Sequence, residues 1–336
     1  MPIWTDLYRE IHEQPEAVGR LLAMERGSVS ELAAAIQERE ISHVVIAARG
    51  TSDNAARYAK YVLGAMNGLT VALATPSLFS LYGRPPRFGN ALVMGISQSG
   101  KSPDIVAVLA EARRQGALTG VLTNTPESDL GSVGDVVINL QCGTEKAVAA
   151  TKTYTTSLGA VAMLSTAIGR DADRQRELAA MPEAMTATLA MNEEIARIAP
   201  RYRYMEGCVV IGRGYNYATA FELALKMQEL TYTVVQHYSS ADFLHGPMAM
   251  IEPGFPVIVV APSGALEAEM IDFLGVLAAR QAETIVISDR PEILDRARIP
   301  LALPQSVPEW LSPLTTILPG QMLSMHLAHE RDLNVD

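Results

Sequence analysis

Three ionisable side chains share one face of an otherwise apolar stretch in the second half of the chain. Over residues 217–230 (YATAFELALKMQEL) the apolar spacing predicts a helix, with Glu222, Lys226 and Glu229 at positions i, i+4 and i+7. Residues at these spacings lie on the same side of a helix. Such a row is most often a solvated ladder of ion pairs, but a carboxylate held beside an ammonium group can also move a proton.

A histidine follows this helix in a stretch of small and polar residues. His245 stands directly before Gly246-Pro247, a dipeptide that favours a loop. Loop histidines are more often structural than catalytic. An imidazole and a carboxylate near a sugar phosphate would nevertheless suit proton transfers on a carbonyl compound.

A turn with three hydroxyl side chains and one amide lies in the first half of the chain. Residues 97–102 (SQSGKS) follow a predicted strand, and a helix is predicted over residues 105–115. Free N–H groups at a helix start, surrounded by hydroxyls, suit a phosphate monoester. The alternative is a serine-rich helix cap that binds nothing. The turn matches neither GxxxxGK[ST] nor GxGxxG, so a nucleoside triphosphate or a dinucleotide is not favoured.

Two further turns bear on this anion site. Residues 50–54 (GTSDN) form a second donor-rich turn after the first predicted strand and could face the same ligand. Residues 261–264 (APSG) occupy the matching place in the second half and have lost most of the hydroxyls. We therefore expect the anion site in the first half only.

The elements that must position these residues repeat along the chain. Buried parallel strands are predicted at 43–48, 91–96, 120–123, 208–212, 256–261 and 284–288, each followed by a turn and a helical pattern. Arg49-Gly50 and Ser99-Gly100 recur 164 positions later as Arg213-Gly214 and Ser263-Gly264. The predicted fold class is α/β, with two doubly wound parallel sheets related by an internal repeat.

The repeat also sets the expected domain organisation. We expect an N-terminal helical segment at 1–27, a phosphate-binding subdomain at 28–165, a helical connector at 166–194, and a second subdomain with the catalytic helix and histidine loop at 195–336. In such sheets ligands bind beyond the carboxyl ends of the strands, where these turns lie.

Composition excludes several classes of protein. The chain has 336 residues, 49% of them hydrophobic, and a net charge of −10, so a nucleic-acid binder is not expected. Two cysteines exclude a disulfide scaffold and favour the cytoplasm. No apolar run of about 18 residues predicts a membrane span, and the first residues do not form a signal peptide.

The remaining candidate residues receive structural or no roles. His326 and His329 stand three apart on a helix predicted over residues 321–330, without further ligands, so a metal site is not expected. Cys142 and Cys208 have no CxxC partner and are assigned no function.

Taken together, the motifs resemble the sugar isomerase (SIS) family. The resemblance is strongest to the isomerase half of glutamine–fructose-6-phosphate transaminase and to stand-alone SIS-type glucosamine-6-phosphate deaminases. The similar stretches are residues 9–17 (REIHEQPEA), 50–54, 96–100 (ISQSG), 143–156 (GTEKAVAATKTYTT), 212–214 (GRG), 222–229 (ELALKMQE), 245–247 (HGP) and 256–262 (PVIVVAP).

The resemblance implies two flavodoxin-like SIS subdomains, a hexose 6-phosphate ligand and no metal, nucleotide or redox cofactor. It implies that Glu229 moves a proton between C1 and C2, that Glu222 and Lys226 assist, and that His245 opens the sugar ring from the neighbouring subunit of a homodimer. The implied substrate-binding residues are Ser97, Gln98, Ser99 and Ser102 at the phosphate, Gly50, Thr51 and Ser52 in the adjoining turn, and Val148 and Thr151 along the sugar.

Two departures from the family bear on activity. The sequence holds no glutaminase half, so transaminase activity is not expected, and residues 331–336 (RDLNVD) resemble the start of a tail whose lysine is absent here. The serine, proline and aspartate at 102–104 are more like the stand-alone deaminases.

We therefore predict a glucosamine-6-phosphate deaminase that yields fructose 6-phosphate and ammonia. The alternatives are an isomerase component related to the transaminase, a fructosamine-6-phosphate deglycase and a non-catalytic sugar-phosphate sensor.

Overall fold

The computed structural model of the chain describes residues 5–336 and groups them into two compact units. The β1–β5 unit comprises residues 16–145 and 152–180. The β6–β10 unit comprises, among the described residues, 5–15, 146–151 and 181–336. The expectations about residues 1–4, including the absence of a signal peptide, lie outside the described residues.

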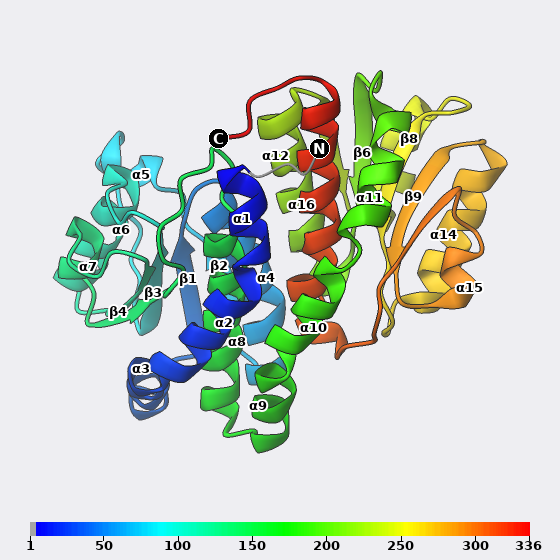
Figure 1. The fold of residues 1–336 in the computed structure, drawn as a ribbon. Helices are drawn as coiled ribbons and strands as arrows, with labels where there is room; N and C mark the ends of the chain where they lie inside the picture. The colour runs from blue at the N-terminus through cyan, green and yellow to red at the C-terminus, as the bar shows by residue number, and fades with distance from the viewer. Residues whose placement is uncertain (1–4) are drawn as a thin grey trace. The chain divides into compact units, whose positions relative to one another are not determined.

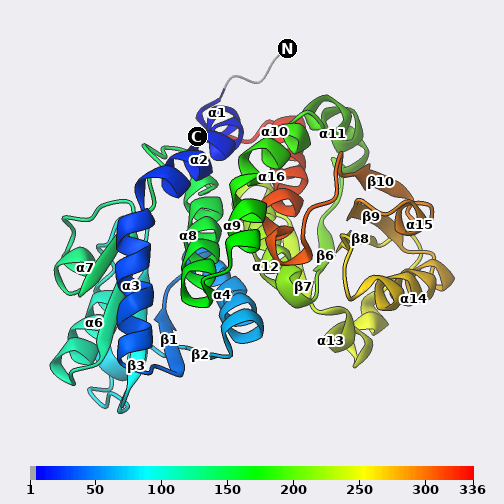
Figure 2. The same cartoon turned by 90° about the horizontal axis from the view of Figure 1, so that it is seen from below.

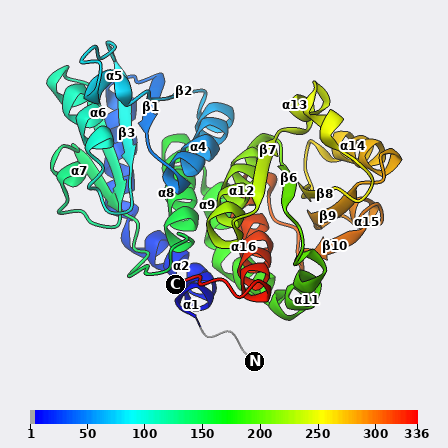
Figure 3. The same cartoon turned by 90° about the horizontal axis from the view of Figure 1, so that it is seen from above.

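The β1–β5 unit is built on one parallel sheet in the order β2-β1-β3-β4-β5. Helices α3 and α4 contact one face of the sheet and α8 packs on both of these helices, whereas α6 lies on the opposite face with α5 and α7 beside it (Figure 3). The strands are β1 His43–Ala47, β2 Thr70–Leu73, β3 Ala91–Ile96, β4 Leu118–Thr123 and β5 Val136–Asn139. The helices are α2 Gln14–Met24, α3 Arg26–Glu38, α4 Thr51–Asn67, α5 Ser77–Ser80, α6 Pro103–Arg114, α7 Asp129–Ser132, α8 Lys152–Gly169 and α9 Ala172–Ala179.

The β6–β10 unit repeats this plan, in the order β10-β9-β8-β6-β7. Helices α12 and α16 lie on one side of the sheet and α14 on the other (Figures 1 and 2). The strands are β6 Gly207–Ile211, β7 Val234–Tyr238, β8 Pro256–Val260, β9 Glu283–Ser288 and β10 Ile299–Ala302. The α-helices are α1 Asp6–His12, α10 Met181–Leu189, α11 Asn192–Ile198, α12 Tyr217–Thr231, α13 Ser240–Leu244, α14 Glu267–Ala279, α15 Pro291–Leu294 and α16 Pro313–Glu330. The short 3₁₀ helices are η1 Ala199–Tyr202, η2 Gly214–Asn216, η3 Pro247–Met250 and η4 Glu309–Leu311.

The two sheets have the same strand order when the second is read from β7 to β10, which confirms the predicted fold class. All pairs in both sheets are parallel, as expected for strands joined by crossover helices. The doubly wound order 2-1-3-4-5 places ligands where the chain reverses direction across the sheet.

Some predicted boundaries are wrong. The helix predicted at 321–330 begins at Pro313 and passes through Pro319. Proline at the first helical position starts α6 at Pro103, two residues before the predicted start. Strand β4 begins at Leu118 rather than at residue 120.

Helix α12, which carries the ionisable row, packs closely along α16. A Cβ atom placed on Gly320 of α16 would lie 2.5 Å from Cδ1 of Leu223 on α12, so a larger residue there would have to displace the leucine side chain. Asn216, directly before α12, donates from Nδ2 to Ser312 Oγ at 2.7 Å and accepts from Thr316 at 2.7 Å. These contacts fix the position of α12 within its unit.

None of the helices within residues 5–336 has the length and apolar character needed to cross a membrane.

Candidate active site

The two donor-rich turns meet at the carboxyl edge of the β1–β5 sheet. Strands β1 and β3 are neighbours, with Ala47 opposite Gly95, and the chain leaves them toward opposite edges of the sheet. This is the switch point at which doubly wound sheets bind ligands. Arg49, after β1, donates to a carboxylate oxygen of Asp104, after β3, at 2.7 Å and so ties the turns together.

Hydroxyl groups, rather than charged groups, organise the turn at residues 97–102. Ser97 Oγ accepts the N–H of Gly100 at 3.2 Å, and Ser99 Oγ accepts that of Lys101 at 3.4 Å. Gly100 has φ +62°, and a Cβ there would lie 1.9 Å from Ser128 Oγ. Ser102 is the N-cap of α6, but its side chain makes no capping hydrogen bond. The turn thus presents weakly engaged donors at the positive end of a helix.

The turn at residues 50–54 adds a second helix start. Gly50, with φ +54°, is the N-cap of α4 and has no side chain that could cap the helix. Thr51 and Ser52 are the first helical residues, and Ser52 is buried. The N-termini of α4 and α6 therefore adjoin the same edge of the sheet, an arrangement that favours an anion.

The equivalent turn of the β6–β10 unit is occupied by the protein's own carboxylates. The backbone N–H groups of residues 263–265 donate to Asp289 at 2.6 Å, Glu267 at 3.0 Å and Glu309 at 2.9 Å. A Cβ on Gly264 would lie 2.3 Å from the carboxyl carbon of Glu309, so no space remains for an external anion. The turn that has lost its hydroxyl side chains thus has carboxylates of the protein itself as hydrogen-bond acceptors.

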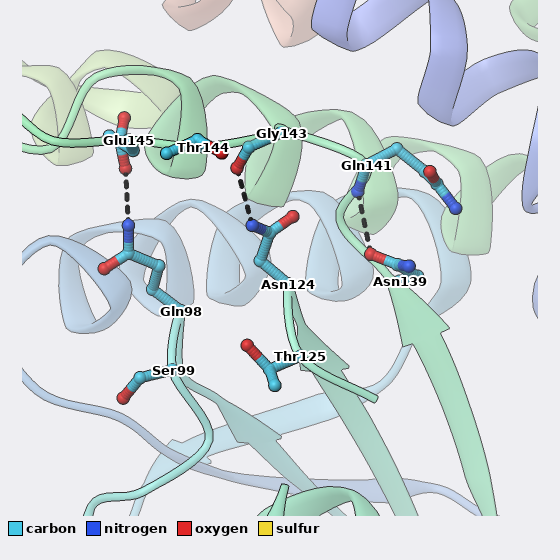
Figure 4. Close-up of a pocket in the computed structure, with 9 residues that line it drawn as sticks. All are labelled: Gln98, Ser99, Asn124, Thr125, Asn139, Gln141, Gly143, Thr144 and Glu145. Atoms are coloured by element: carbon cyan, nitrogen blue, oxygen red, sulfur yellow. Dashed lines mark hydrogen bonds between the residues drawn. The ribbon is translucent and has the colours of Figure 1, made fainter. Parts of the chain in front are cut away.

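A pocket of about 570 Å³ adjoins the turn at 97–102, above the ends of β3, β4 and β5. Amide side chains reach across it to the following loop: Gln98 Nε2 donates to Glu145 Oε2 at 2.9 Å and Asn124 Nδ2 donates to the Gly143 carbonyl at 2.8 Å (Figure 4). The pocket is lined by Gln98, Ser99, Asn124, Thr125, Asn139, Gln141, Gly143, Thr144 and Glu145.

The ionisable row on α12 is buried and is not a solvated ladder. Glu222 and Lys226 have side chains 0% and 1% exposed, and Glu229 is 32% exposed. Lys226 Nζ lies 3.4 Å from Glu222 Oε1 and 2.7 Å from Glu229 Oε2. A buried ammonium group therefore holds one buried carboxylate and one carboxylate that solvent can reach.

Electrostatics keep Lys226 charged. Burial by itself would lower its pKa, but the adjacent carboxylates of Glu222 and Glu229 outweigh burial and raise it above its ordinary value. The charged ammonium group therefore lies beside a carboxylate that solvent can reach, an arrangement that suits a general base.

His245 and Glu229 lie toward opposite ends of β7. His245 is the exposed C-cap of α13, after the end of β7, and its ring makes no hydrogen bond to the rest of the described chain. Gln228, beside Glu229, donates to Val235 at the start of β7 at 2.7 Å. Four residue steps along a strand span about 13 Å, so the two ends of β7 keep these side chains apart.

Val148 and Thr151 lie in the segment 146–151, which groups with the β6–β10 unit. Val148 is 65% exposed, whereas Thr151 is buried. Two acidic residues contact this region, Glu10 and Glu145. Both lie in stretches that carry the family resemblance, but the sequence alone assigns neither a role.

The residues predicted to be structural have structural surroundings. His326 Nε2 pairs with Asn192 Oδ1 at 2.9 Å, and burial lowers the pKa of His326 to about 4. Burial raises the pKa of Cys142 to about 11 and that of Cys208 to about 12, so both stay as thiols. Residues 5–336 contain no cluster of three or more potential metal ligands.

Comparison with known proteins gives a consistent result. The model of the SIS domain family matches residues 39–167 and 207–331, one copy in each repeat. A protein of known structure from Silicibacter pomeroyi DSS-3, provisionally classed as a phosphosugar isomerase, is 36% identical with a TM-score of 0.90, over 99% of this chain and 100% of that one. The C-terminal domain of glucosamine-fructose-6-phosphate aminotransferase from Francisella tularensis is 27% identical with a TM-score of 0.91, over 99% and 98%.

A curated relative, the isomerizing glutamine–fructose-6-phosphate aminotransferase of Zymomonas mobilis, is 32% identical over 98% of this chain. The match covers 57% of that enzyme, so the chain spans about half the length of this relative.

Proposed function

The chain belongs to the SIS domain family, and on that premise we propose that it is an amino-sugar phosphate deaminase that converts glucosamine 6-phosphate and water into fructose 6-phosphate and ammonia. The observation that carries the proposal is the contrast between the repeats: one switch-point turn is held by hydroxyls and open to an anion, and the other is filled by carboxylates.

The phosphate anchor would use the donors at the ends of β1 and β3. Ser97, Gln98, Ser99 and Ser102 would hold the phosphate, with Gly50, Thr51 and Ser52 beside them. Two helix N-termini favour the dianion there. The phosphate is remote from the reacting carbons, so its binding energy serves to position them.

The proton transfer would use Glu229. In the open-chain sugar the aldehyde at C1 acidifies the C2 proton, which Glu229 would remove and return to C1. The product is an imine at C2, and water adds to it and releases ammonia and the ketone. Lys226, which also pairs with Glu222, would hold the Glu229 carboxylate in place, as the contacts of its ammonium group support.

The ring-opening histidine would come from a second copy of the chain. The proposal is supported by the positions of Glu229 near the start of β7 and of His245 beyond its end. Mixing Glu229→Gln with His245→Ala tests this. A mixed dimer would hold one intact site, so random re-association should restore roughly a quarter of wild-type activity. No restoration would contradict shared sites.

A second candidate is a sugar-phosphate isomerase that releases no ammonia. It is favoured by the 36% identity to the Silicibacter pomeroyi protein, whose description names phosphosugar isomerisation. Both reactions begin with the same transfer between C2 and C1 and differ in the substituent at C2.

The test incubates purified protein with glucosamine 6-phosphate and measures ammonia and fructose 6-phosphate. We expect equal amounts of both. The Glu229→Gln variant should bind the sugar phosphate, but its kcat should fall about a hundredfold or more. The control is Glu206→Gln, which replaces an exposed glutamate of the same unit and should leave kcat unchanged. Interconversion of fructose and glucose 6-phosphates without ammonia would favour the second candidate. Tight binding without turnover of any sugar phosphate would refute both.

A further inference from the structure

A glutamate to which the proposed function gives no role is buried in the β6–β10 unit. Glu10, on α1, is 1% exposed. A carboxylate is rarely fully buried unless other groups pair with it or donate to it. Its contacts therefore show what it holds in place.

The donors to Glu10 are backbone groups far away in the sequence. Glu10 Oε1 accepts the N–H of Lys146 at 2.6 Å, and Oε2 accepts the N–H of Ala147 at 3.3 Å. Hydrogen bonds from N–H groups to an ionised carboxylate are stronger than those to neutral acceptors. One buried side chain thus fixes the start of the segment 146–151.

The residues on either side of this segment are tied together by Glu145. Its Oε1 accepts the N–H of Lys152 at 2.7 Å, and its Oε2 accepts the hydroxyl of Thr153 at 2.6 Å. The carboxylate thereby caps the start of α8, a helix of 18 residues, where the helix dipole favours negative charge. The backbone is held at both ends of the segment.

A fixed backbone explains the exposed side chain at its middle. Val148 is 65% exposed, and a branched side chain on a fixed backbone keeps a defined direction. Exposed apolar side chains are common and need no explanation singly. Here two carboxylates, the buried Glu10 and the part-buried Glu145, fix the backbone around the exposed Val148. Such an arrangement suits a surface that must meet a ligand in one conformation.

We infer that Glu10 is a positioning residue for sugar binding, which acts by fixing the segment that carries Val148 and Thr151 against the sugar. The inference rests on the proposed function for the role of that segment. It assigns Glu10 no contact with substrate.

The test is Glu10→Gln, with Glu13→Gln as the matched control. The substituted side chain keeps the size of glutamate but offers one acceptor oxygen where the carboxylate offers two, so the N–H of Lys146 or of Ala147 loses this partner. Glu13 is a part-exposed residue that follows α1 and pairs with Arg9. We expect Glu10→Gln to raise KM for glucosamine 6-phosphate about tenfold, with kcat changed less than about threefold.

Two further readouts separate positioning from a general loss of fold. Inhibition by inorganic phosphate, which reports on the anchor in the β1–β5 unit, should keep its constant within about twofold in Glu10→Gln. Amide hydrogen exchange at Lys146 and Ala147 should accelerate at least about tenfold in Glu10→Gln and stay unchanged in Glu13→Gln. If Glu10→Gln does not fold, Glu10→Asp, which keeps the charge on a shorter side chain, takes its place with the same expectations.

The outcomes distinguish this inference from the proposed function. Equal KM values in Glu10→Gln and Glu13→Gln would overturn the inference, as would a loss confined to kcat. If wild type neither binds nor turns over hexose 6-phosphates, the proposed function fails. Amide exchange then still decides whether Glu10 fixes the segment.

Discussion

Replacing Lys226 by methionine should destabilise the β6–β10 unit in a pH-dependent manner. The ammonium group is 1% exposed and lies 3.4 Å from Glu222 and 2.7 Å from Glu229. Without it, Glu229 can be hydrated because it is 32% exposed, whereas Glu222, at 0%, cannot. Leaving one member of a buried ion pair alone typically costs about 3–5 kcal/mol.

Protonation of Glu222 limits this loss. Adding a proton to a carboxylate whose ordinary pKa is about 4.3 costs about 3.7 kcal/mol at pH 7 and about 1 kcal/mol at pH 5. Lys226→Met should therefore lower the free energy of unfolding by about 3–4 kcal/mol at pH 7, relative to wild type at the same pH. At pH 5 the deficit should shrink to about 1 kcal/mol.

The assay is urea unfolding followed by tryptophan fluorescence. Trp310 belongs to the β6–β10 unit and is buried, so in a Trp4→Phe background the signal reports on that unit. Arg203→Met is the control, because it removes an exposed cation from the same unit and should cost less than about 0.5 kcal/mol. A loss below about 1 kcal/mol at pH 7, or one that does not shrink at pH 5, would refute the reasoning.

Three further predictions concern single positions. Burial lowers the pKa of His326 to about 4 from its ordinary value near 6.5. Below pH 6.5 the unfolded chain takes up a proton that the folded chain does not, so the free energy of unfolding should fall by about 2 kcal/mol from pH 7 to pH 5. His326→Asn should remove this part of the pH dependence, and an unchanged slope would contradict the assignment. Gly320→Ala should lower the free energy of urea unfolding by about 1–2 kcal/mol, because the cost of crowding Leu223 exceeds what the higher helix propensity of alanine gains. A more stable variant would show that Leu223 moves aside without cost. Gly100→Ala should weaken binding of a hexose 6-phosphate at least about tenfold by calorimetry, because a Cβ there overlaps Ser128; unchanged affinity would place the anion elsewhere.

The sequence was informative wherever strands are buried on both sides. All six predicted strands exist, because central parallel strands appear as continuous apolar runs. The four strands that were missed are short or half exposed. For example, β2 (Thr70–Leu73) has no fully buried residue, and β7 (Val234–Tyr238) includes Val234 at 69% exposed. Edge strands lack the pattern on which the prediction depends.

The candidate site could be predicted from the sequence only in part. Spacing placed Glu222, Lys226 and Glu229 on one face of α12, but burial of that face depends on α16, which lies about 90 residues later in the sequence. Glu10 accepts from a residue 136 positions away, and no local pattern encodes such a contact. The carboxylates that fill the second turn were invisible for the same reason.

That filled turn has a consequence for how the molecule responds to its surroundings. A duplicated fold with two equivalent sites would bind two ions per chain. In the second repeat the carboxylates of Asp289, Glu267 and Glu309 already accept the N–H groups that an anion would need. We therefore expect its conformation not to change with the phosphate concentration. Titration with inorganic phosphate should therefore reach a stoichiometry of one ion per chain, and only the turn at residues 97–102 should bind it.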